Sequence, residues 1–370
     1  MNIVWFNWKD LDHPQAGGAE VVNEELAARL AAHGHTVTFL TSGFPKAAAT
    51  TTRRGFTIIR TGSRFTNYFT AALYYIRHKS TLKPDLVIDE CNTLPYFAGY
   101  YSGTKTVLFF HMLCRDIWYY EFPKPWSSLG FKLEPHYLKL LKPKKTVITV
   151  SHSTKRDLLR LGFPQANIHL ISEGIQIQPV PSKSNITKYA EPTLLSFGAM
   201  RPMKRTLDQI EAFDIAKRAN PKLKLIVAGD SSGEYGKQVL ARISASPFKD
   251  SITVLGRVSQ EKKIEVMQKS HLLMVTSVKE GWGLVVTEAA SQFTPSIVYD
   301  VDGLRDAVKH GETGLIVPQN PQSLADAALE LLRDDNLYIT LQTTGWEWSK
   351  YLTFDQSYID FTRAIGLKNL

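Results

Sequence analysis

Short apolar runs alternate with amphipathic stretches along the first half of the chain. Residues 2–6 are typical of a buried strand, and residues 19–32 have the periodicity of an amphipathic helix. With helix-like stretches between them, further strands are predicted at residues 36–40, 86–88, 106–110 and 146–150. Strands that alternate with helices imply a parallel, doubly wound sheet, so this half is predicted to be a Rossmann-like α/β domain.

A second α/β rhythm follows residues 176–192, which are rich in Pro, Ser and Lys, lack a clear period and are interpreted as a linker. Strands are then predicted at 193–196, 223–228, 252–254, 272–276 and 296–299, and helices at 206–219, 260–269 and 284–291. The predicted domains are residues 1–178 and 190–349, with a cleft between them. Because ligands bind beyond the carboxyl ends of such strands, the loops after strands are the candidate sites.

Composition and charge limit the classes of protein to consider. The chain has 370 residues, of which 44% are hydrophobic, and two cysteines, Cys91 and Cys114, which cannot form a disulfide framework. The N-terminus lacks the apolar core of a signal peptide, and no apolar run approaches the ~20 residues of a membrane span. A cytoplasmic protein is expected, attached at most to the inner face of a membrane.

The formal charge of +9 suits nucleic acid, anionic lipid or a phosphorylated substrate as partner. The sequence has no zinc finger and no RNA-binding signature, so nucleic acid is not expected. The simpler interpretation is ordinary solubility charge around a basic, anion-binding cleft.

The most informative stretch is residues 278–290, which follow a predicted strand, pass through a loop and enter a helix. Gly281 and Gly283 allow backbone N–H groups to approach a ligand at a helix N-terminus, which favours anions. Glu280 stands at the mouth of this loop, and Glu288 lies about one turn into the helix. The stretch predicts an anion-binding loop that carries two carboxylates.

Glu288 has no cationic residue at the three- and four-residue spacings of its helix, so no local ion pair explains it. A carboxylate on so apolar a helix needs a hydrogen-bond partner elsewhere, and the two hydroxyls of a ribose are a fitting one. The alternative is a solvated surface glutamate, with Glu280 helping to cap the helix.

With these residues in view, the chain resembles the retaining glycosyltransferase family 4, whose members have the two-Rossmann GT-B architecture. Glu280-x7-Glu288 resembles the paired-glutamate signature of that family. The other matching stretches follow in the same order along nearly the whole chain: Gly17-Gly18-Ala-Glu, Val107-Leu-Phe-Phe-His111, Thr149-Val-Ser-His-Ser-Thr-Lys, Phe197-Gly198 to Lys204, and Gly311 to Pro318. Each motif is weak alone, and their joint order makes the resemblance specific.

The resemblance implies roles for individual residues. Lys204 is placed on the donor diphosphate, in agreement with its position between a glycine-containing turn and a helix. The family has an arginine where this chain has Ala199, so Arg201 is expected to take over that role. Catalytic roles are expected for Glu280, His111 and Lys204. Donor binding is expected for Gly17, Gly18, Arg201, Lys204, Gly281, Trp282, Gly283, Leu284 and Glu288.

Within this scheme Glu280 orients the donor sugar, Glu288 holds the ribose and His111 contacts the transferred sugar. The glycine pair Gly17-Gly18 faces a phosphate or sugar, or else only permits the turn into its helix. Lys204, Arg201 and the amides of residues 281–284 stabilise the departing diphosphate without a metal or other cofactor. Asp300-Val-Asp302 looks like a metal-binding pair, but its position late in the second domain disfavours that role.

The sequence does not identify the acceptor molecule. The donor is expected to be a UDP- or GDP-sugar, and the acceptor is expected to contain a sugar. The domains are expected to close over the donor and exclude water. The aromatic tail 350–370 is expected to pack back on the first domain. Aromatics in residues 115–137 beside Lys139, Lys142, Lys144 and Lys145 either contact an anionic membrane or form core next to a solvated helix.

Two other functions stay open at this stage. A GT-B-fold sugar-nucleotide epimerase would bind a similar donor with different acid/base residues. A non-catalytic nucleotide-sugar or nucleic-acid binder would share the basic charge without needing both glutamates. Donor turnover discriminates among the three.

Overall fold

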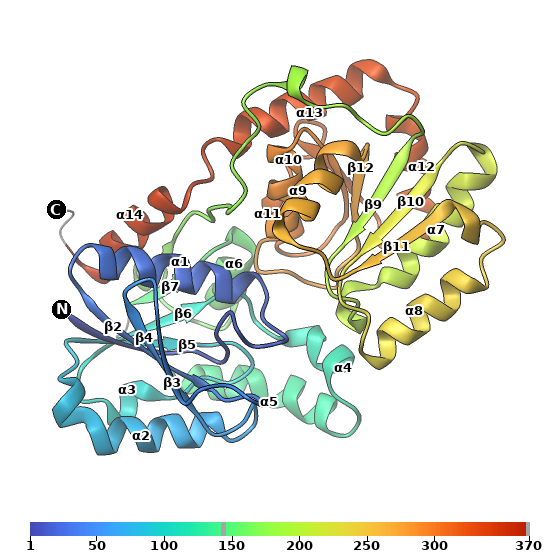
Figure 1. Ribbon diagram of the computed structural model, residues 1–370. Coiled ribbons are helices and arrows are strands. Elements are labelled where there is room, and N and C mark those ends of the chain that lie inside the picture. The colour runs from blue at the N-terminus through green and yellow to red at the C-terminus, as the bar shows by residue number, and fades with distance from the viewer. Residues whose placement is uncertain (142–145, 368–370) are drawn as a thin grey trace. The chain divides into compact units, whose positions relative to one another are not determined.

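Two parallel sheets, each covered by helices, organise the chain in the computed structural model, which describes residues 1–141 and 146–367 (Figure 1). Unit 1 comprises the described parts of Met1–Trp118, Lys124–Gly174 and the segment from Thr353 onward. Unit 2 comprises Ile175–Leu352 together with the short segment Tyr119–Pro123. The chain therefore enters unit 2 twice and returns to unit 1 at its C-terminal end.

The sheet of unit 1 has the strand order β3-β4-β2-β1-β5-β6-β7-β8. Its strands are β1 (Asn2–Phe6), β2 (Thr36–Ser42), β3 (Thr50–Arg53), β4 (Phe56–Thr61), β5 (Leu86–Glu90), β6 (Lys105–Phe110), β7 (Val147–Thr149) and β8 (Ile168–Leu170). All neighbours are parallel except β3 and β4, which are antiparallel. The predicted parallel sheet is thus present, with one antiparallel edge strand that the sequence pattern did not indicate.

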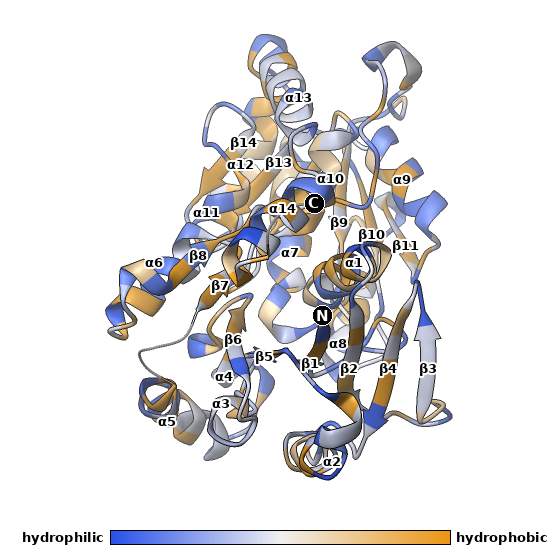
Figure 2. Cartoon of the chain, turned by 90° about the vertical axis from the view of Figure 1, so that its left-hand side faces the viewer, coloured by the Kyte–Doolittle hydropathy of each residue, from blue (hydrophilic) through white to orange (hydrophobic). Residues whose placement is uncertain are grey.

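Helices cover both faces of this sheet. They are α1 (Gly18–Ala32), α2 (Asn67–Leu82), α3 (Ala98–Tyr101), α5 (Trp126–Leu140), α6 (His152–Arg160) and α14 (Phe354–Ile365), with short 3-10 turns η1 (Arg115–Ile117) and η2 (Gln165–Asn167). The short helix α4 (Trp118–Glu121) lies mostly in the segment that belongs to unit 2. Figure 1 shows α1 and α14 on one face and α2, α3 and α5 on the other. Strands such as β7 are apolar, whereas the edge strand β3 is polar (Figure 2), as expected where the central strands of a sheet are buried on both faces.

The C-terminal aromatic segment contributes to the core of unit 1. Phe361 on α14 is fully buried and its ring stacks on Trp5 of β1, with centroids 5.6 Å apart and ring planes 2° apart. Trp5 also contacts Phe39 of β2 and Phe109 of β6. Arg29 on α1 pairs with Asp355 on α14 at 2.9 Å. Residues more than 300 positions apart therefore share one aromatic cluster.

The sheet of unit 2 is parallel throughout, in the order β11-β10-β9-β12-β13-β14. Its strands are β9 (Thr193–Phe197), β10 (Lys224–Ala228), β11 (Ile252–Gly256), β12 (Leu272–Val275), β13 (Ser296–Tyr299) and β14 (Gly314–Val317). Its helices are α7 (Thr206–Ala219), α8 (Glu234–Ser244), α9 (Gln260–Lys269), α10 (Leu284–Ser291), α11 (Leu304–Ala307), α12 (Pro321–Leu331) and α13 (Asp335–Ser349), with 3-10 turns η3 (Lys183–Asn185), η4 (Pro202–Lys204) and η5 (Lys249–Ser251).

In both sheets the strand order reverses next to the first strand of the unit. The reversal lies between β1 and β5 in unit 1 and between β9 and β12 in unit 2. Loops that leave the carboxyl ends of these strands diverge and leave room for a ligand. The residues of interest are therefore those that follow β1, β5, β9 and β12.

The predicted linker is an irregular segment apart from η3, and it is fastened to unit 2. The Lys188 ammonium donates to the carbonyls of Ser270 and Phe293 at 2.7 and 2.9 Å. Trp346 on α13 donates to the Val180 carbonyl at 2.8 Å. The C-terminal part of the chain forms two helices, α13 and α14, separated at residues 350–353. Among the described helices, none combines the length and apolar character that crossing a membrane requires.

Candidate functional site

The loop after β9 forms the first part of the candidate site. Gly198 N–H donates to the Ala228 carbonyl at 2.9 Å, and Met200 N–H donates to the Asp230 carbonyl at 2.8 Å. These bonds hold the loop against the end of β10. The chain then makes the turn η4, which contains Lys204, and enters α7 at Thr206.

Lys204 directly contacts Glu280, a residue 76 positions away. Its ammonium donates to Glu280 Oε1, which also accepts a hydrogen bond of 2.6 Å from Ser277 Oγ. Both side chains are largely buried. The cation expected at the diphosphate and the carboxylate expected at the sugar therefore lie together. An ammonium has three donors, so Lys204 can hold Glu280 and still donate to a phosphate oxygen.

Backbone and side-chain bonds join the two loops that carry these residues. Val278 N–H donates to the Met203 carbonyl at 2.8 Å. Thr276 Oγ1, at the end of β12, donates to the Lys204 carbonyl at 2.8 Å and accepts from Gln209 of α7 at 2.8 Å. Because each loop is bonded to the other, the distance between Lys204 and Glu280 is set by the fold rather than by two free side chains.

A third loop, after β13, supports Glu280 from the other side. Glu280 N–H donates to the Asp302 carbonyl at 3.0 Å. Gly303 has φ +83°, and a Cβ at this position would overlap the Glu280 carbonyl. Only glycine combines that backbone conformation with so close an approach. The Asp302-Gly303 pair thus shapes the site through its backbone.

The carboxylates of Asp300 and Asp302 are occupied by cations of the protein. Arg305 contacts both carboxylates, and Lys279 lies 3.2 Å from Asp302. Burial opposes ionisation of Asp302, but Lys279 and Arg305 outweigh it and lower its pKa. In the part of the chain that the structure describes, no group of three or more His, Cys, Asp or Glu residues could hold a metal. A metal role for this pair therefore has no support from the geometry.

Helix α10 begins immediately after the loop, with Gly283 as its N-cap. Gly283 has φ +108°, and a Cβ there would press against Leu304. The first N–H groups of a helix lack partners within the helix and carry its positive dipole end, so this terminus suits an anion. Trp282, beside it, has a buried Nε1 with no hydrogen-bond partner among the described residues, and its ring lies 6.2 Å from that of Trp348.

The structure shows a protein partner for Glu288 that the sequence pattern did not indicate. No cation lies on its own helix, as expected, but Lys263 on α9 reaches it from 25 residues away. The Lys263 ammonium lies 2.7 Å from each of the two carboxylate oxygens. The buried carboxylate therefore has a partner within the protein and does not depend on a ligand to satisfy it. Sequence spacing gave no signal for this pair, because the two helices meet only in the folded chain.

Arg201 precedes η4 and is partly buried. Its Nε is buried with no hydrogen-bond partner among the described residues. A buried guanidinium N–H without a partner is costly. Arg201 thus has a donor to offer a ligand in the loop that also carries Lys204.

Gly17 and Gly18 belong to unit 1, at the start of α1. Gly17 has φ −143°, an extended conformation open to any residue, and a Cβ there would meet only Glu20 Oε2, at 3.7 Å. A turn requirement thus does not explain Gly17. Its N–H donates to Glu20 Oε2 at 2.6 Å, in a capping box. The Gly17 amide is therefore not free for a phosphate, which limits the expected contact to the following amides.

His111 also belongs to unit 1, directly after β6. Its Nε2 lies 2.9 Å from Asn23 Oδ1 on α1 and 3.8 Å from Glu90 Oε1 at the end of β5. Because Asn23 Oδ1 is an acceptor, Nε2 carries the proton and Nδ1 is left as an acceptor. Burial lowers the pKa of His111 to about 3, so the imidazole is neutral at neutral pH.

The residues chosen from the sequence thus fall into two groups. Lys204, Arg201, Glu280 and the start of α10 lie together in unit 2, while His111 and the glycine pair lie in unit 1. Sequence reasoning missed the partners of these residues: Ser277, Lys263, Asn23, Glu90 and Glu20. Of these, Glu20 had a signal, because a glutamate three residues after an N-cap is the mark of a capping box. The others are joined only by tertiary contacts.

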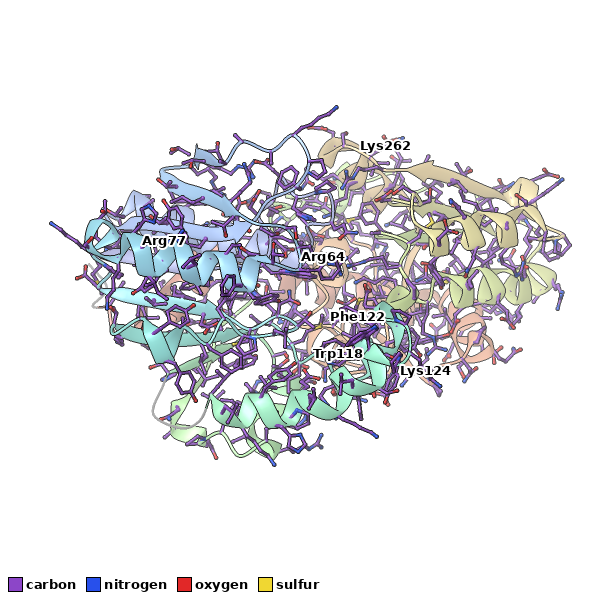
Figure 3. The ribbon with its side chains drawn as sticks, turned by 90° about the horizontal axis from the view of Figure 1, so that it is seen from below. Arg64, Arg77, Trp118, Phe122, Lys124 and Lys262 are labelled. Atoms are coloured by element: carbon purple, nitrogen blue, oxygen red, sulfur yellow. The ribbon has the colours of Figure 1, made fainter. Side chains whose placement is uncertain are left out.

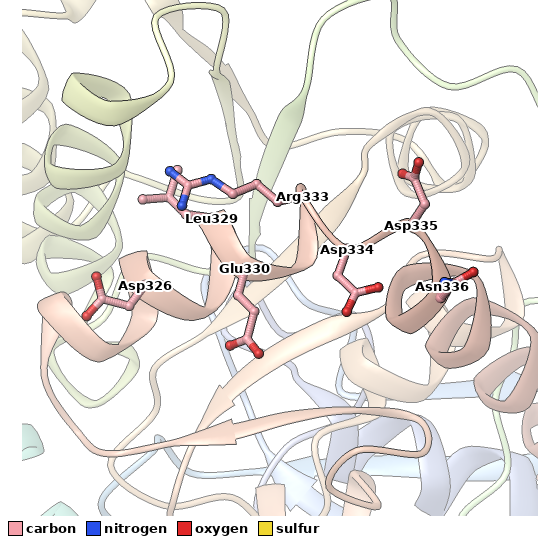
Figure 4. A pocket seen from close by; sticks show the side chains of 7 residues that line it. All are labelled: Asp326, Leu329, Glu330, Arg333, Asp334, Asp335 and Asn336. Carbon is pink, nitrogen blue, oxygen red and sulfur yellow. The ribbon is translucent and has the colours of Figure 1, made fainter.

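A pocket where α12 meets α13 is a poor alternative donor site. It is lined by Asp326, Leu329, Glu330, Arg333, Asp334, Asp335 and Asn336 (Figure 4). Four carboxylates repel a diphosphate. Asp334 is engaged in capping α13, where it accepts from Leu337 N–H at 2.9 Å. Helix α12 starts at the carboxyl end of β14 and runs back, so this pocket also lies at the opposite edge of the sheet from the candidate site.

Comparison with known families matches both units of the chain. The family described as glycosyl transferases group 1 matches residues 181–346, and glycosyltransferase family 4 matches residues 16–178. Together the two matches cover most of the chain, and they include every residue assigned to donor binding or catalysis.

Curated relatives are enzymes of the same kind. The chain is 24% identical over 367 residues to N-acetyl-alpha-D-glucosaminyl L-malate synthase of Bacillus anthracis, covering 88% of this chain and 87% of that protein. It is 27% identical over 202 residues to D-inositol 3-phosphate glycosyltransferase of Nocardia farcinica, covering 47% of this chain and 45% of that protein. For the second relative, the match spans about half of its length.

Solved structures show the same fold. Sucrose-phosphate synthase from Thermosynechococcus elongatus has a TM-score of 0.83 at 21% identity, with 98% of each chain covered. Anabaena Alr3699/HepE in complex with UDP-glucose has a TM-score of 0.76 at 16% identity, covering 98% of this chain and 99% of that one. The two family matches favour a glycosyltransferase over the epimerase and the non-catalytic binder. The chain therefore belongs to the group 1 glycosyltransferases of family 4, which have the GT-B fold and transfer a sugar from a nucleotide sugar.

Proposed function

We propose that this glycosyltransferase moves a hexose from a UDP- or GDP-sugar to a hydroxyl of a sugar-containing or small-molecule acceptor, with retention of the anomeric configuration. The observation that carries the proposal is the contact between Lys204 and Glu280 beside the N-terminus of α10. A cation, a carboxylate and free amide donors then meet where strand order reverses in unit 2.

The roles of the residues that bind the donor diphosphate follow from the charge that develops in the reaction. As the nucleoside diphosphate departs, negative charge grows on its oxygens, and preorganised cations and N–H groups stabilise it. Lys204, Arg201 and the amides of residues 281–284 supply these groups. The buried, unpartnered Nε of Arg201 supports its assignment to the diphosphate. This set neutralises the diphosphate without a metal.

Glu280 and Glu288 then have separate tasks. Glu280, held by Lys204 and Ser277, hydrogen-bonds hydroxyls of the transferred sugar, and Glu288 accepts from the ribose. In unit 1, the neutral His111 contacts the transferred sugar through Nδ1, and the amides after Gly17 face the sugar or phosphate. Retention follows from attack by the acceptor on the face that the diphosphate leaves.

The donor and acceptor classes draw support from relatives. The Anabaena structure named above holds UDP-glucose, which supports a uridine nucleotide donor. The curated relatives act, by their names, on L-malate and on inositol 3-phosphate, both of which carry hydroxyl groups. A hydroxyl acceptor is the feature that these relatives share.

A panel of UDP-, GDP- and ADP-sugars tests this proposal by thermal melting and by slow hydrolysis of the donor. One donor should raise the melting temperature, because a ligand at about 100 times its Kd stabilises the native state by about 2.7 kcal/mol. Glu288→Ala should abolish most of that rise, and Glu312→Ala, which removes an exposed carboxylate of the same unit, should not. Hydrolysis should persist in a chelator. The proposal is wrong if no sugar nucleotide binds the intact protein.

We further propose that unit 1 contacts an anionic membrane surface through helix α5. Such a contact would suit a lipid-linked acceptor. One face of α5 is exposed and combines apolar with basic side chains at helical spacing: Trp126, Leu129, Lys132, Leu133, His136, Lys139 and Leu140. Trp126 and Leu140 are 63% and 61% exposed. Such a face suits the boundary between lipid headgroups and acyl chains.

Helix α2, on the same side of the sheet as α5 in Figure 1, also carries exposed apolar side chains. Phe69 on α2 and Phe65 just before it are 73% and 76% exposed. Figure 3 shows Lys124 beside Trp118, near the start of α5, and Arg64 and Arg77 further away, towards α2. Other aromatics of the stretch behave as core, since Trp118 is buried and donates to Glu134, and Tyr137 donates to the Thr93 carbonyl. Lys142, Lys144 and Lys145 lie outside the described residues.

A further inference from the structure

Two charged side chains join helices α9 and α10 at the candidate donor site. The Lys263 ammonium lies 2.7 Å from both oxygens of Glu288, and both side chains are largely buried. Lys263 also lies 5.6 Å from the centre of the Phe197 ring. Phe197 ends β9 and directly precedes the loop that carries Arg201 and Lys204. Lys263 thus contacts both Glu288 and the strand that leads into the loop of Arg201 and Lys204.

Burial and the neighbouring cation act on this carboxyl in opposite directions. Burial raises the pKa of Glu288, and Lys263 opposes that rise through its charge and its hydrogen bond. A protonated carboxyl keeps only part of its acceptor capacity, whereas a carboxylate has about four lone-pair sites. Two of these serve Lys263, and the others remain for the two hydroxyl donors of a ribose.

The remaining charges around α10 point elsewhere. On the neighbouring elements, Arg305 of α11 pairs with Asp300 and Asp302, and Glu347 of α13 pairs with Lys350. The other titratable groups of those two helices are Asp306 of α11 and Asp335 and Tyr338 of α13. Tyr338 donates to the His271 carbonyl. Strands β12 and β13 contribute Tyr299, whose hydroxyl donates to Asp208. Among the described residues, the pKa of Glu288 responds to burial and to Lys263 alone.

We propose that Lys263 is a positioning residue that holds the Glu288 carboxylate ionised and in one orientation for the two hydroxyls of the donor ribose. This inference rests on the proposed function, because it takes Glu288 as the ribose acceptor. Lys263 acts through Glu288 and does not itself need to touch the donor.

A purely structural role for the pair is the competing explanation. Gln268 on α9 also donates to Gln292, the residue directly after α10, at 2.9 Å, so the two helices have a second side-chain bond one turn further on. Gln268→Met removes that bond without touching the carboxylate. It is therefore the matched control for a loss of helix packing.

The test compares binding of UDP and GDP with binding of their 2′,3′-dideoxy analogues, measured by calorimetry at about pH 6 and about pH 8. Wild-type protein and the Gln268→Met variant should prefer the ribonucleotide by roughly tenfold or more at both pH values, since hydrogen bonds to a charged group are the strong ones. Lys263→Met should lose most of that preference at the lower pH. It should regain part of it at the higher pH, where Glu288 ionises without the lysine.

Further variants fix the interpretation. Lys263→Arg should retain the preference, because it keeps the charge. In a Glu288→Gln background, which mimics the neutral carboxyl, Lys263→Met should have no further effect on the preference. If Lys263→Met does not fold, Lys263→Gln replaces it.

The outcomes separate the two proposals. A full ribose preference in Lys263→Met at both pH values overturns the inference while the proposed function stands. A wild-type protein that binds the nucleotides with no ribose preference overturns the role of Glu288 and the inference with it. A wild-type protein that binds no nucleotide overturns the proposed function and the inference together.

Discussion

At the scale of single residues, unit 1 buries ionisable groups where β1, β5 and β6 end. Glu90 is fully buried, and its Oε1 has no hydrogen-bond partner among the described residues, while Oε2 accepts from Trp8 N–H at 3.1 Å. Burial and the nearby Glu20 raise the pKa of Glu90 to about 8. His111 lies beside it as a neutral imidazole. Such perturbed groups at the end of a strand favour a functional role for this edge of the sheet.

Glu90 should make the stability of unit 1 depend on pH. Its pKa is 4.5 when unperturbed and about 8 in the fold, so the native state favours the protonated form. The stability that this protonation provides is present below about pH 4.5 and is lost as the pH rises through about 8. Glu90→Gln keeps an acceptor for Trp8 and cannot ionise. The difference in urea midpoint between this variant and wild type should therefore increase from mildly acidic to alkaline pH.

Over this pH range the free energy of unfolding of Glu90→Gln, relative to wild type, should increase by more than about 1.4 kcal/mol, which corresponds to a difference of one in pKa. Asp116→Asn, which neutralises an exposed carboxylate of the same unit, serves as control and should show no such trend. Equal pH profiles for wild type and Glu90→Gln would mean that Glu90 is already ionised in the native protein.

At the scale of elements, α14 is the clearest case of a segment whose role depends on where it packs. The helix presents Phe361 to Trp5 and Phe109, and its Asp355 pairs with Arg29 on α1. Gly174, the last residue of unit 1 before unit 2 begins, leaves no room for a Cβ against Phe354. The C-terminal segment thus completes a core that begins with the first strand of the chain.

Phe361→Ala should destabilise unit 1 strongly. Removal of a fully buried aromatic ring leaves a cavity and costs about 3 to 5 kcal/mol. Tyr351→Ala, which removes a ring that is 75% exposed in the preceding turn, should cost less than about 0.5 kcal/mol. Thermal melting of the two variants checks this, and similar melting temperatures would argue against the docking of α14.

At the scale of the whole molecule, the excess of 44 basic over 35 acidic residues gives the chain a net charge of +9. That charge attracts nucleotide and anionic lipid alike, so it does not identify a partner. The distribution of side chains is more informative, because α5 places apolar and basic residues on one exposed face. A surface of that kind gains from apolar burial and from electrostatic attraction at the same time.

Vesicle flotation tests the membrane proposal. The protein should float with vesicles that contain anionic phosphatidylglycerol and stay behind with purely zwitterionic ones. Each Lys or Arg near an anionic surface contributes about 1 kcal/mol. Binding should therefore fall as salt rises to about 1 M, where the Debye length shortens to about 3 Å.

A pair of matched substitutions locates the surface. Leu133 on α5 and Ile339 on α13 are both 48% exposed. Leu133→Glu should reduce vesicle binding by about tenfold, since it exchanges an inserted apolar group for a charge, and Ile339→Glu should leave it unchanged. Failure of the wild-type protein to float with anionic vesicles at low salt would end the proposal.

Much of this architecture is encoded locally. Apolar periodicity placed β1, β13, α7, α9 and α10 at the residues where they occur, because a buried strand and an amphipathic helix each impose a pattern on consecutive residues. Local sequence patterns likewise predicted the glycine-containing loop that carries Glu280 and the start of α10. The antiparallel edge strand β3 was not, because four polar residues at a sheet edge carry no such pattern.

The partners of the site residues required the tertiary structure. By itself, the sequence singled out Glu280 in the loop after a strand and Glu288 on the helix that follows, and the family resemblance added Lys204. Only the fold decided that Lys204 meets Glu280, that Lys263 meets Glu288 and that Glu90 and Asn23 surround His111. The physical reason is distance along the chain. Periodicity reports on neighbours a few residues apart, whereas these ion pairs and hydrogen bonds join segments that only the parallel strand order brings together.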